Sequence, residues 1–196
     1  MTVDRIESLD KRRSKVFLNG DFAFVLFQGE IAKYRLREGE TISFELYEEI
    51  LWQVVGKRAR EKALALLKTQ ARTEDEIRGK LTFHLFPTAT IEETIRFLKE
   101  YHYLDDEAYA VSYVEVHGQK KSRAELEYAL RRKGIDREVI RRVLRDTGTD
   151  SREAITTLLR KRGICPDSTP QERQKAFAYL LRRGFSWEEI RAAAED

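Results

Sequence analysis

Short capped helices recur along most of the chain, and this recurrence limits the fold more than any other feature of the sequence. Four segments begin with a serine or threonine three residues before a glutamate, the spacing at which the two residues cap a helix start reciprocally. Apolar residues at helical spacing follow each start, which indicates amphipathic helices. The four pairs are Thr73 and Glu76, Thr90 and Glu93, Ser122 and Glu125, and Ser186 and Glu189.

The helix ends repeat as well. Residues 131–135 read Arg-Arg-Lys-Gly-Ile, and residues 181–185 read Leu-Arg-Arg-Gly-Phe. Basic residues followed by glycine and a hydrophobic residue are typical of a helix C-terminus. Starts and ends together predict a mostly α fold of three tandem three-helix repeats, over 58–100, 105–146 and 151–196. Because a single repeat of this size buries little surface, we expect the three to stack as a short elongated solenoid.

The N-terminal residues differ from the rest and predict a small β-hairpin module. Ser14–Leu18 and Asp21–Phe27 are rich in Val and Phe, and Asn19-Gly20 between them is the strongest short hairpin signal. Successive side chains of a strand point to opposite faces, and in the second segment apolar residues occur at both the even and the odd positions. Both faces of this strand should therefore be at least partly covered. Glu30–Leu36 is compatible with a third strand or a short helix. The parts that precede the repeats are therefore the hairpin module at 1–40 and a linking helix at 41–57.

Charge is abundant and unevenly distributed. Charged residues make up 36% of the chain, against about 25% in a typical globular domain. Residues 118–196 carry a net charge of +6, whereas residues 1–117 carry −3. A basic C-terminal half favours an acidic or polyanionic partner, although an excess of this size does not establish nucleic-acid binding.

The sequence favours a reducing compartment. Its one cysteine, Cys165, cannot form an intramolecular disulfide. Met1–Arg13 lacks the apolar core of a signal peptide. The longest apolar run, Phe22–Phe27, is far below the roughly 18 residues that a membrane span needs. We therefore expect a cytoplasmic protein that does not enter a membrane.

The residues that could carry chemistry do not form catalytic or metal-binding patterns. His84, His102 and His117 have no histidine or cysteine three or four residues away, as paired metal ligands on a helix would. Asp105-Asp106-Glu107 precedes an apolar pattern and is better explained as a helix cap. Gly118–Ser122 ends in Lys-Ser but lacks the upstream glycine of a nucleotide loop. We expect no cofactor, no metal, no small-molecule substrate and no enzymatic activity.

Aromatic residues cluster between the first and second predicted repeats. Tyr109 and Tyr113 are four residues apart and share a helix face, and Tyr101 and Tyr103 lie just before them. Stacking on nucleic-acid bases is one interpretation. Packing between two helical repeats is the better one, because amphipathic helices commonly bury such residues.

Basic residues of the C-terminal half are the candidate binding surface. Several precede a glycine at a helix end, where their charge also stabilises the helix dipole. Dipole effects do not explain Arg137, Arg141 and Arg145, which recur every fourth residue on one face; pairing with acids of a neighbouring repeat is the alternative to partner binding. The candidates for contacts with a partner protein or DNA are Lys120, Lys121, Arg123, Arg131, Arg132, Lys133, Arg137, Arg141, Arg145, Arg160, Lys161, Arg162, Arg182 and Arg183.

Several segments, in their order and spacing, resemble the RecX family of recombination regulators. They are Thr73–Leu81, Tyr103–Ala110, Ser122–Ile135 and Ala178–Phe185. The resemblance covers nearly the whole chain and implies three tandem three-helix units without catalytic activity. It also implies a protein that binds the RecA recombinase filament on DNA and modulates its recombinase and ATPase activity, with inhibition as the expected direction and remodelling or tuning of the filament as the alternatives. One departure concerns Gly118, which lies earlier than the glycine that usually precedes the start of the middle unit.

Two other classes of function remain open. A stand-alone DNA-binding helical protein should carry base-reading side chains at the start of a recognition helix. The helix that follows Asp136 begins with Arg137 and Glu138, a poor set for sequence-specific reading, but nonspecific binding of single- or double-stranded DNA is compatible with it. A generic helical-repeat scaffold for another protein is the second alternative.

Overall fold

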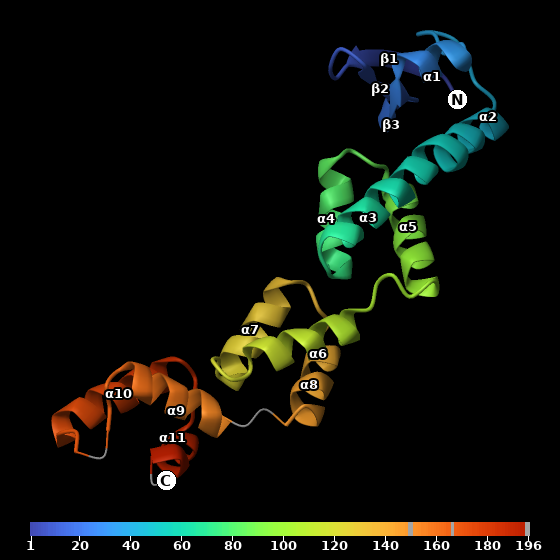
Figure 1. The fold of residues 1–196 in the computed structure, drawn as a ribbon. Helices are drawn as coiled ribbons and strands as arrows, with labels where there is room; N and C mark the ends of the chain where they lie inside the picture. The colour runs from blue at the N-terminus through green and yellow to red at the C-terminus, as the bar shows by residue number, and fades with distance from the viewer. Residues whose placement is uncertain (149–150, 166, 195–196) are drawn as a thin grey trace. The chain divides into compact units, whose positions relative to one another are not determined.

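The computed structural model describes residues 1–148, 151–165 and 167–194 (Figure 1). These residues form two compact units, the first over Met1–Leu104 and the second from Asp105 onward. The first unit contains an antiparallel three-stranded sheet, and both units are otherwise mostly helical. The predicted fold class, mostly α with three three-helix repeats behind a small β module, is confirmed.

The β module has one strand more than predicted. The strands β1 (Val3–Ser8), β2 (Arg13–Leu18) and β3 (Asp21–Phe27) pair in that order. The predicted β2–β3 hairpin is present, and its turn residues Asn19 and Gly20 both have positive φ, at 49° and 90°. The strand β1 was missed because its sequence, VDRIES, is largely polar and only Val3 is buried.

The ambiguous segment after β3 is helical rather than a third strand. It forms α1 (Gln28–Lys33), whose third residue, Glu30, accepts a hydrogen bond from the Phe27 backbone amide at 2.8 Å. Three consecutive residues of β3, Phe24 to Leu26, are buried, as expected for a strand covered on both faces. A register shift between Val16 and Phe17 of β2 accompanies this departure from alternation.

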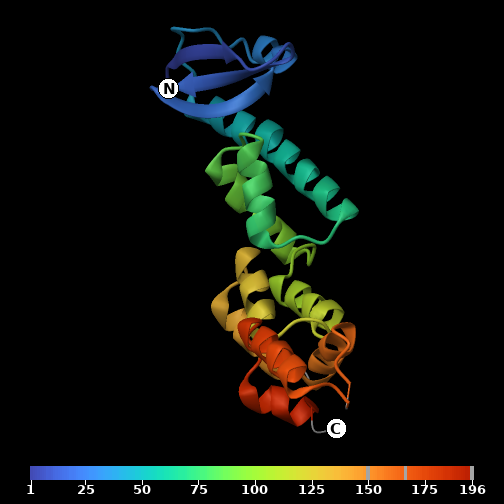
Figure 2. The same ribbon diagram turned by 90° about the vertical axis from the view of Figure 1, so that its left-hand side faces the viewer.

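One continuous helix joins the sheet to the first repeat. It comprises α2 (Phe44–Glu49), the π-helical segment η1 (Ile50–Gly56) and α3 (Lys57–Thr69), so the linking helix predicted for 41–57 continues unbroken into the repeat. Figure 2 shows the three strands side by side at the beginning of this helix. Ile50, Leu51 and Val55 of η1 are buried with residues of the sheet in one hydrophobic cluster.

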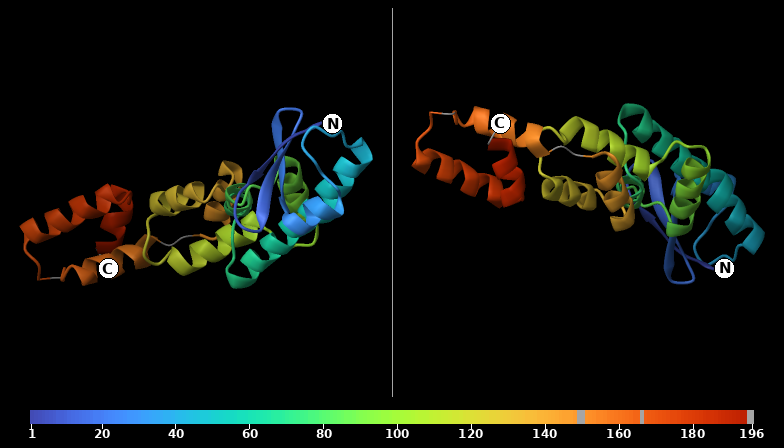
Figure 3. Two further views of the ribbon diagram at one scale, coloured as in Figure 1. Left: turned by 90° about the horizontal axis from the view of Figure 1, so that it is seen from above. Right: turned by 90° about the horizontal axis from the view of Figure 1, so that it is seen from below.

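Each repeat consists of three helices that pack around its own core (Figure 3). Repeat 1 adds α4 (Glu74–Phe83) and α5 (Thr88–Glu100) to α3. Repeat 2 contains α6 (Asp106–His117), α7 (Arg123–Arg132) and α8 (Arg137–Asp146). Repeat 3 contains α9 (Ser151–Lys161), α10 (Pro170–Arg182) and α11 (Trp187–Ala194). The last two residues of the predicted third repeat, 195 and 196, lie outside the described residues.

Most of the predicted helix starts are correct. Reciprocal hydrogen bonds link Thr73 with Glu76, Ser122 with Glu125, and Ser186 with Glu189. The prediction for Thr90 and Glu93 is wrong, because α5 begins after Pro87, and the buried Thr90 hydroxyl donates to the Pro87 carbonyl at 2.8 Å. A further capping box, Thr169 with Glu172 and Pro170 at the first helical position, was missed.

The second helix of every repeat ends in the same backbone turn. Its closing residue adopts a left-handed conformation: Leu85 (φ 61°), Gly134 (φ 77°) and Gly184 (φ 87°). The hydrophobic residue that follows donates its amide to a leucine carbonyl five residues earlier, at 3.2–3.3 Å. This is the hydrogen bond of a Schellman motif. The matching sequence signal was visible in repeats 2 and 3 but not in repeat 1, where leucine replaces glycine.

Gly184 should tolerate substitution worse than other left-handed glycines. A Cβ on Gly184 would lie 2.7 Å from the Ala124 Cβ, whereas a Cβ on Gly163 (φ 70°) would meet nothing within 4 Å. Gly163→Ala should therefore cost about 1–2 kcal/mol from backbone strain alone. Gly184→Ala should cost about 1–3 kcal/mol more, because of the added clash. Urea denaturation followed by circular dichroism measures both, and equal losses would contradict the contact.

Candidate partner-binding surface

Arg137, Arg141 and Arg145, which we call the arginine ladder of α8, are only partly free of ion-pair partners. Arg141 donates to the Glu138 carboxylate on its own helix at 2.6 Å, and Arg145 contacts Asp146 at 3.2 Å. Arg137 is exposed and has no partner among the described residues. The acids that pair with the ladder thus lie on α8 itself, not on a neighbouring repeat.

A fourth arginine of α8 has a structural role. Arg142 donates two hydrogen bonds to the Glu107 carboxylate of α6, at 2.8 and 2.5 Å. This bidentate pair holds the pKa of Glu107 below its usual value and raises that of Arg142. It joins the first and third helices of repeat 2. Glu107 belongs to the predicted acidic cluster, and Asp105 caps α6 by accepting from the Ala108 amide at 2.9 Å, as expected.

Two arginines at the end of α7 are free of internal partners. Arg131 and Arg132 occupy its last turn, are exposed and have no partner among the described residues. Only the turn from Lys133 to Asp136 separates them from Arg137 at the start of α8. We call Arg131, Arg132 and Arg137 the turn cluster. Since no ion pair must break before they bind a partner, these three cations of repeat 2, like the exposed Lys120, are suited to intermolecular contacts.

Three other candidates interact with aromatic rings or with a helix end. The Lys121 ammonium contacts the Tyr113 hydroxyl at 3.1 Å, and Lys133 lies 5.2 Å from the centre of the Tyr109 ring. Both tyrosines pack against the core of repeat 2. These contacts lie within one repeat, whereas the prediction was packing between two repeats. Arg123 donates to the Leu144 carbonyl at 2.9 Å and thereby caps the end of α8.

The other two aromatic residues lie in the first unit. Tyr101 and Tyr103 are 59% and 55% exposed. Tyr101 contacts Phe97 of repeat 1, with 4.8 Å between ring centres. Neither belongs to a buried hydrophobic cluster of the residues that the structure describes.

Arg183 joins repeat 3 to repeat 2. It donates two hydrogen bonds to the Glu125 carboxylate, both at 2.8 Å, and one to the Lys120 carbonyl at 3.1 Å. The Ser122 hydroxyl donates to the Arg183 carbonyl. The hydrogen bond to Glu125 raises the pKa of Arg183 despite partial burial. Glu125 and Ser122 are the capping residues of α7, so one helix start also anchors the neighbouring repeat.

The remaining candidates also divide into residues with internal contacts and residues without them. Arg162 stacks on the Tyr179 ring at 3.6 Å. The side chains of Lys120, Arg160, Lys161 and Arg182 are exposed and have no partner in the described part of the chain. Arg162 and Arg183 both contact the Tyr179 ring, and Arg183 also binds the Glu125 carboxylate and the Lys120 carbonyl; we call these contacts of Arg183 the Arg183 junction. The turn cluster is grouped by its place around the α7–α8 turn, and the other predicted residues are spread over repeats 2 and 3.

Neither a metal site nor a membrane helix emerges from residues 1–148, 151–165 and 167–194. No three histidine, cysteine, aspartate or glutamate side chains gather there in a metal-binding arrangement. None of the helices in these ranges combines the length and apolarity that a membrane crossing requires.

The fold defines a class, tandem three-helix repeats behind a small sheet. Three family models then match the chain: the first three-helix domain of RecX at residues 59–98, the second at 105–144 and the third at 150–193. Together these matches cover more than half of the residues, so the chain belongs to the RecX family of regulatory proteins.

Similar proteins match over most of their length. The regulatory protein RecX of Caldanaerobacter subterraneus subsp. tengcongensis is 30% identical and aligns over 98% of each chain. That of Clostridium acetobutylicum is 28% identical over 96% of this chain and 92% of its own. A crystal structure of a regulatory protein RecX covers 100% of this chain and 99% of that one, with 26% identity and a TM-score of 0.67. RecX from Lactobacillus salivarius gives 27% identity, a TM-score of 0.63 and coverage of 72% and 95%.

The Arg183 junction should contribute to stability. Replacing Arg183, which is 21% exposed, by Met keeps its apolar stem but leaves Glu125 without its strongest partner. The loss should be about 1–3 kcal/mol, as for other charged hydrogen bonds. Arg182→Gln, next to it but without a described partner, should change stability by less than about 0.5 kcal/mol. Urea denaturation compares the two variants, and a harmless Arg183→Met would show that the junction contributes nothing.

Proposed function

We propose that this chain binds the RecA recombinase filament on DNA and inhibits its recombinase and ATPase activity. Membership of a family of regulatory proteins supports a regulatory role. The turn cluster is the structural observation that carries the contact hypothesis, because its three guanidinium groups have no internal acceptor to give up. An acidic protein surface or DNA phosphates would supply acceptors for them.

The distribution of charge along the chain also supports binding of an acidic partner through repeat 2. Residues 118–196, which include the turn cluster, carry a net charge of +6, whereas residues 1–117 carry −3. Within residues 118–196, the third helix of repeat 2 starts with Arg137, whereas that of repeat 3 starts with Trp187, Glu188 and Glu189. The two helix starts thus differ in charge, and the free guanidinium group of Arg137 makes the α7–α8 turn of repeat 2 the proposed contact.

The decisive assay is RecA-dependent ATP hydrolysis on single-stranded DNA with this protein titrated in. Inhibition at stoichiometric amounts is the expected result. The triple change of Arg131, Arg132 and Arg137 to Gln should weaken inhibition and filament binding, and it should flatten their salt dependence. Stability should stay within about 1 kcal/mol of the original, since the three side chains are at the surface.

The matched control uses arginines of the same repeat that already have partners. The double change Arg141→Gln and Arg145→Gln removes two positive charges that are already paired with carboxylates of α8. This double variant should weaken binding less per charge than the triple variant. Equal effects per charge would show that internal pairing does not select the contact residues, and unchanged ATP hydrolysis with the original protein would refute the proposed function.

A recovery experiment separates the alternative functions. The protein is immobilised and exposed to lysate with and without added ATP, and with and without nuclease treatment. RecA recovered in an ATP- and DNA-dependent manner supports filament binding. DNA recovered without RecA favours a nonspecific DNA-binding protein, for which Lys120, Arg160, Lys161 and Arg182 are further exposed cations.

A further inference from the structure

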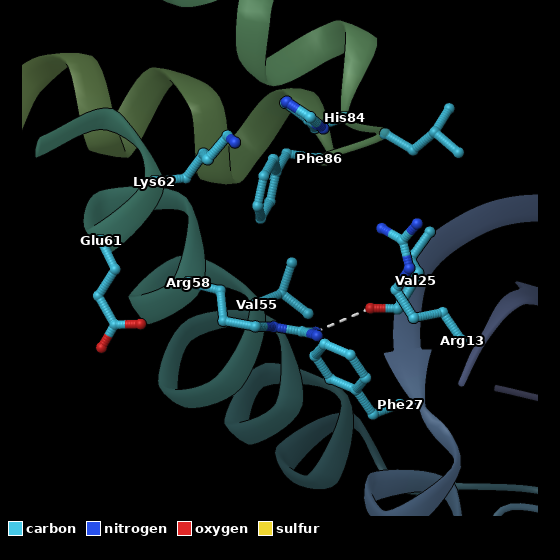
Figure 4. A pocket seen from close by; sticks show the side chains of 10 residues that line it. Arg13, Val25, Phe27, Val55, Arg58, Glu61, Lys62, His84 and Phe86 are labelled. Carbon is cyan, nitrogen blue, oxygen red and sulfur yellow. Dashed lines mark hydrogen bonds between the residues drawn. The ribbon is translucent and has the colours of Figure 1, made fainter. Parts of the chain in front are cut away.

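A cavity in the first unit lies outside the surface discussed so far. It has a volume of about 460 Å³ and is bounded by β2, β3, α3 and the turn between α4 and α5 (Figure 4). Its apolar wall includes Val25, Val55 and Phe86. Pockets of about 300–1,000 Å³ with an apolar wall and a few polar groups are typical of small-ligand sites. Its residues come from distant parts of the sequence, so no local motif reveals it.

Three permanent cations line this cavity. Arg13 pairs with Asp10 at 2.7 Å, whereas Lys62 has no partner among the described residues. Arg58 reaches across from α3 and donates to the Val25 carbonyl at 2.8 Å, as Figure 4 shows. The same figure shows the one lining carboxylate, that of Glu61, turned away from Lys62 and Arg13.

The position of Arg58 in the cavity wall is energetically unfavourable for its guanidinium group. Its guanidinium lies 3.4 Å from the Glu30 carboxylate and 4.9 Å from the centre of the Phe27 ring. Its buried Nε–H has no acceptor. Burial lowers the pKa of Arg58, and only part of that effect is offset by Glu30. A partly desolvated cation with incomplete hydrogen bonding favours the approach of an anion.

His84 also lines the cavity, next to these cations. Burial and the nearby charges of Lys62, Arg13 and Lys80 lower its pKa. Its ring contacts that of Phe83, which is 80% exposed, at 5.5 Å. The exposed Phe83 side chain therefore contacts His84, one of the residues that line the cavity.

The wall of the cavity also contains a strained residue. Leu85 adopts φ 61°, although glycine occupies the matching turn position in the other two repeats. Leucine rarely adopts this conformation, and glycine would adopt it freely. The side chain that causes the strain lines the cavity and is half-buried. Backbone strain of this kind often accompanies a binding function.

We propose that this cavity binds a small organic anion with an apolar body, such as an aromatic carboxylate. The apolar body packs against Val55, Leu85 and Phe86. The carboxylate lies among the cations, with Lys62 as its free partner. The site belongs to the first unit and does not depend on the turn cluster or on RecA.

The test uses 1-naphthoate and its neutral counterpart 1-naphthalenemethanol with the full-length ¹⁵N-labelled protein. NMR titration should show saturable shifts at residues of β3, α3 and the α4–α5 turn, with tighter binding of the acid than of the alcohol. Bound naphthoate should also raise the pKa of His84, because its negative charge offsets the neighbouring cations. Absence of saturable shifts at these residues, or equal affinity for both probes, would overturn the proposal.

Matched variants separate the charge from the apolar wall. Lys62→Gln should weaken naphthoate binding roughly twofold to fivefold, as expected for loss of one partly exposed charge, and leave the alcohol unaffected. Lys68→Gln, on an exposed position of the same helix, should change neither. Leu85→Gly should weaken both probes while the backbone strain is relieved and the fold retained. If Lys62→Gln and Lys68→Gln behave alike, or Leu85→Gly binds as the original does, the assignment of the site is wrong.

Discussion

The turn that ends the second helix of each repeat is the constraint on which the fold depends. A left-handed residue reverses the chain, and the hydrophobic residue after it returns to the leucine five positions earlier. In repeats 2 and 3 the two residues are buried together, as Leu130 with Ile135 and Leu180 with Phe185. Helices of 8 to 13 residues are marginal alone in water, so their stability depends on this closure and on the apolar faces that it brings together.

The same constraint explains which parts of the fold were predictable. In repeats 2 and 3 the turn contains glycine, and the capping pairs have fixed spacing, so residues close in the sequence revealed both. In repeat 1 the turn contains Leu85 and the third helix starts at Pro87, and the spacing of Thr90 and Glu93 was misleading. The strand β1 could not be found, because its pairing with β2 compensates for a polar sequence that has no strand periodicity of its own.

For the candidate site, the sequence predicted which basic residues are present but not how they are arranged. Sequence identified the basic residues of the second unit, but not which of them already have partners. Arg183 and Arg131 occur in similar helix-end segments, yet Arg183 is bound to Glu125, 58 residues away, and Arg131 is free. Pairing at such sequence distances depends on tertiary packing. The cavity beside β3 was not predicted for the same reason.

The continuous helix from Phe44 to Thr69 joins the sheet and repeat 1 within one compact unit. Phe86 packs against the cluster that contains the sheet and also against the core of repeat 1. Repeat 1 is therefore not a detachable module in the way that its sequence boundaries suggest. A lineage that lost the sheet would have to rebuild the surface around Phe86 and Val55, so gain or loss of this extension is expected to be accompanied by coordinated replacements in the first repeat rather than by simple domain shuffling.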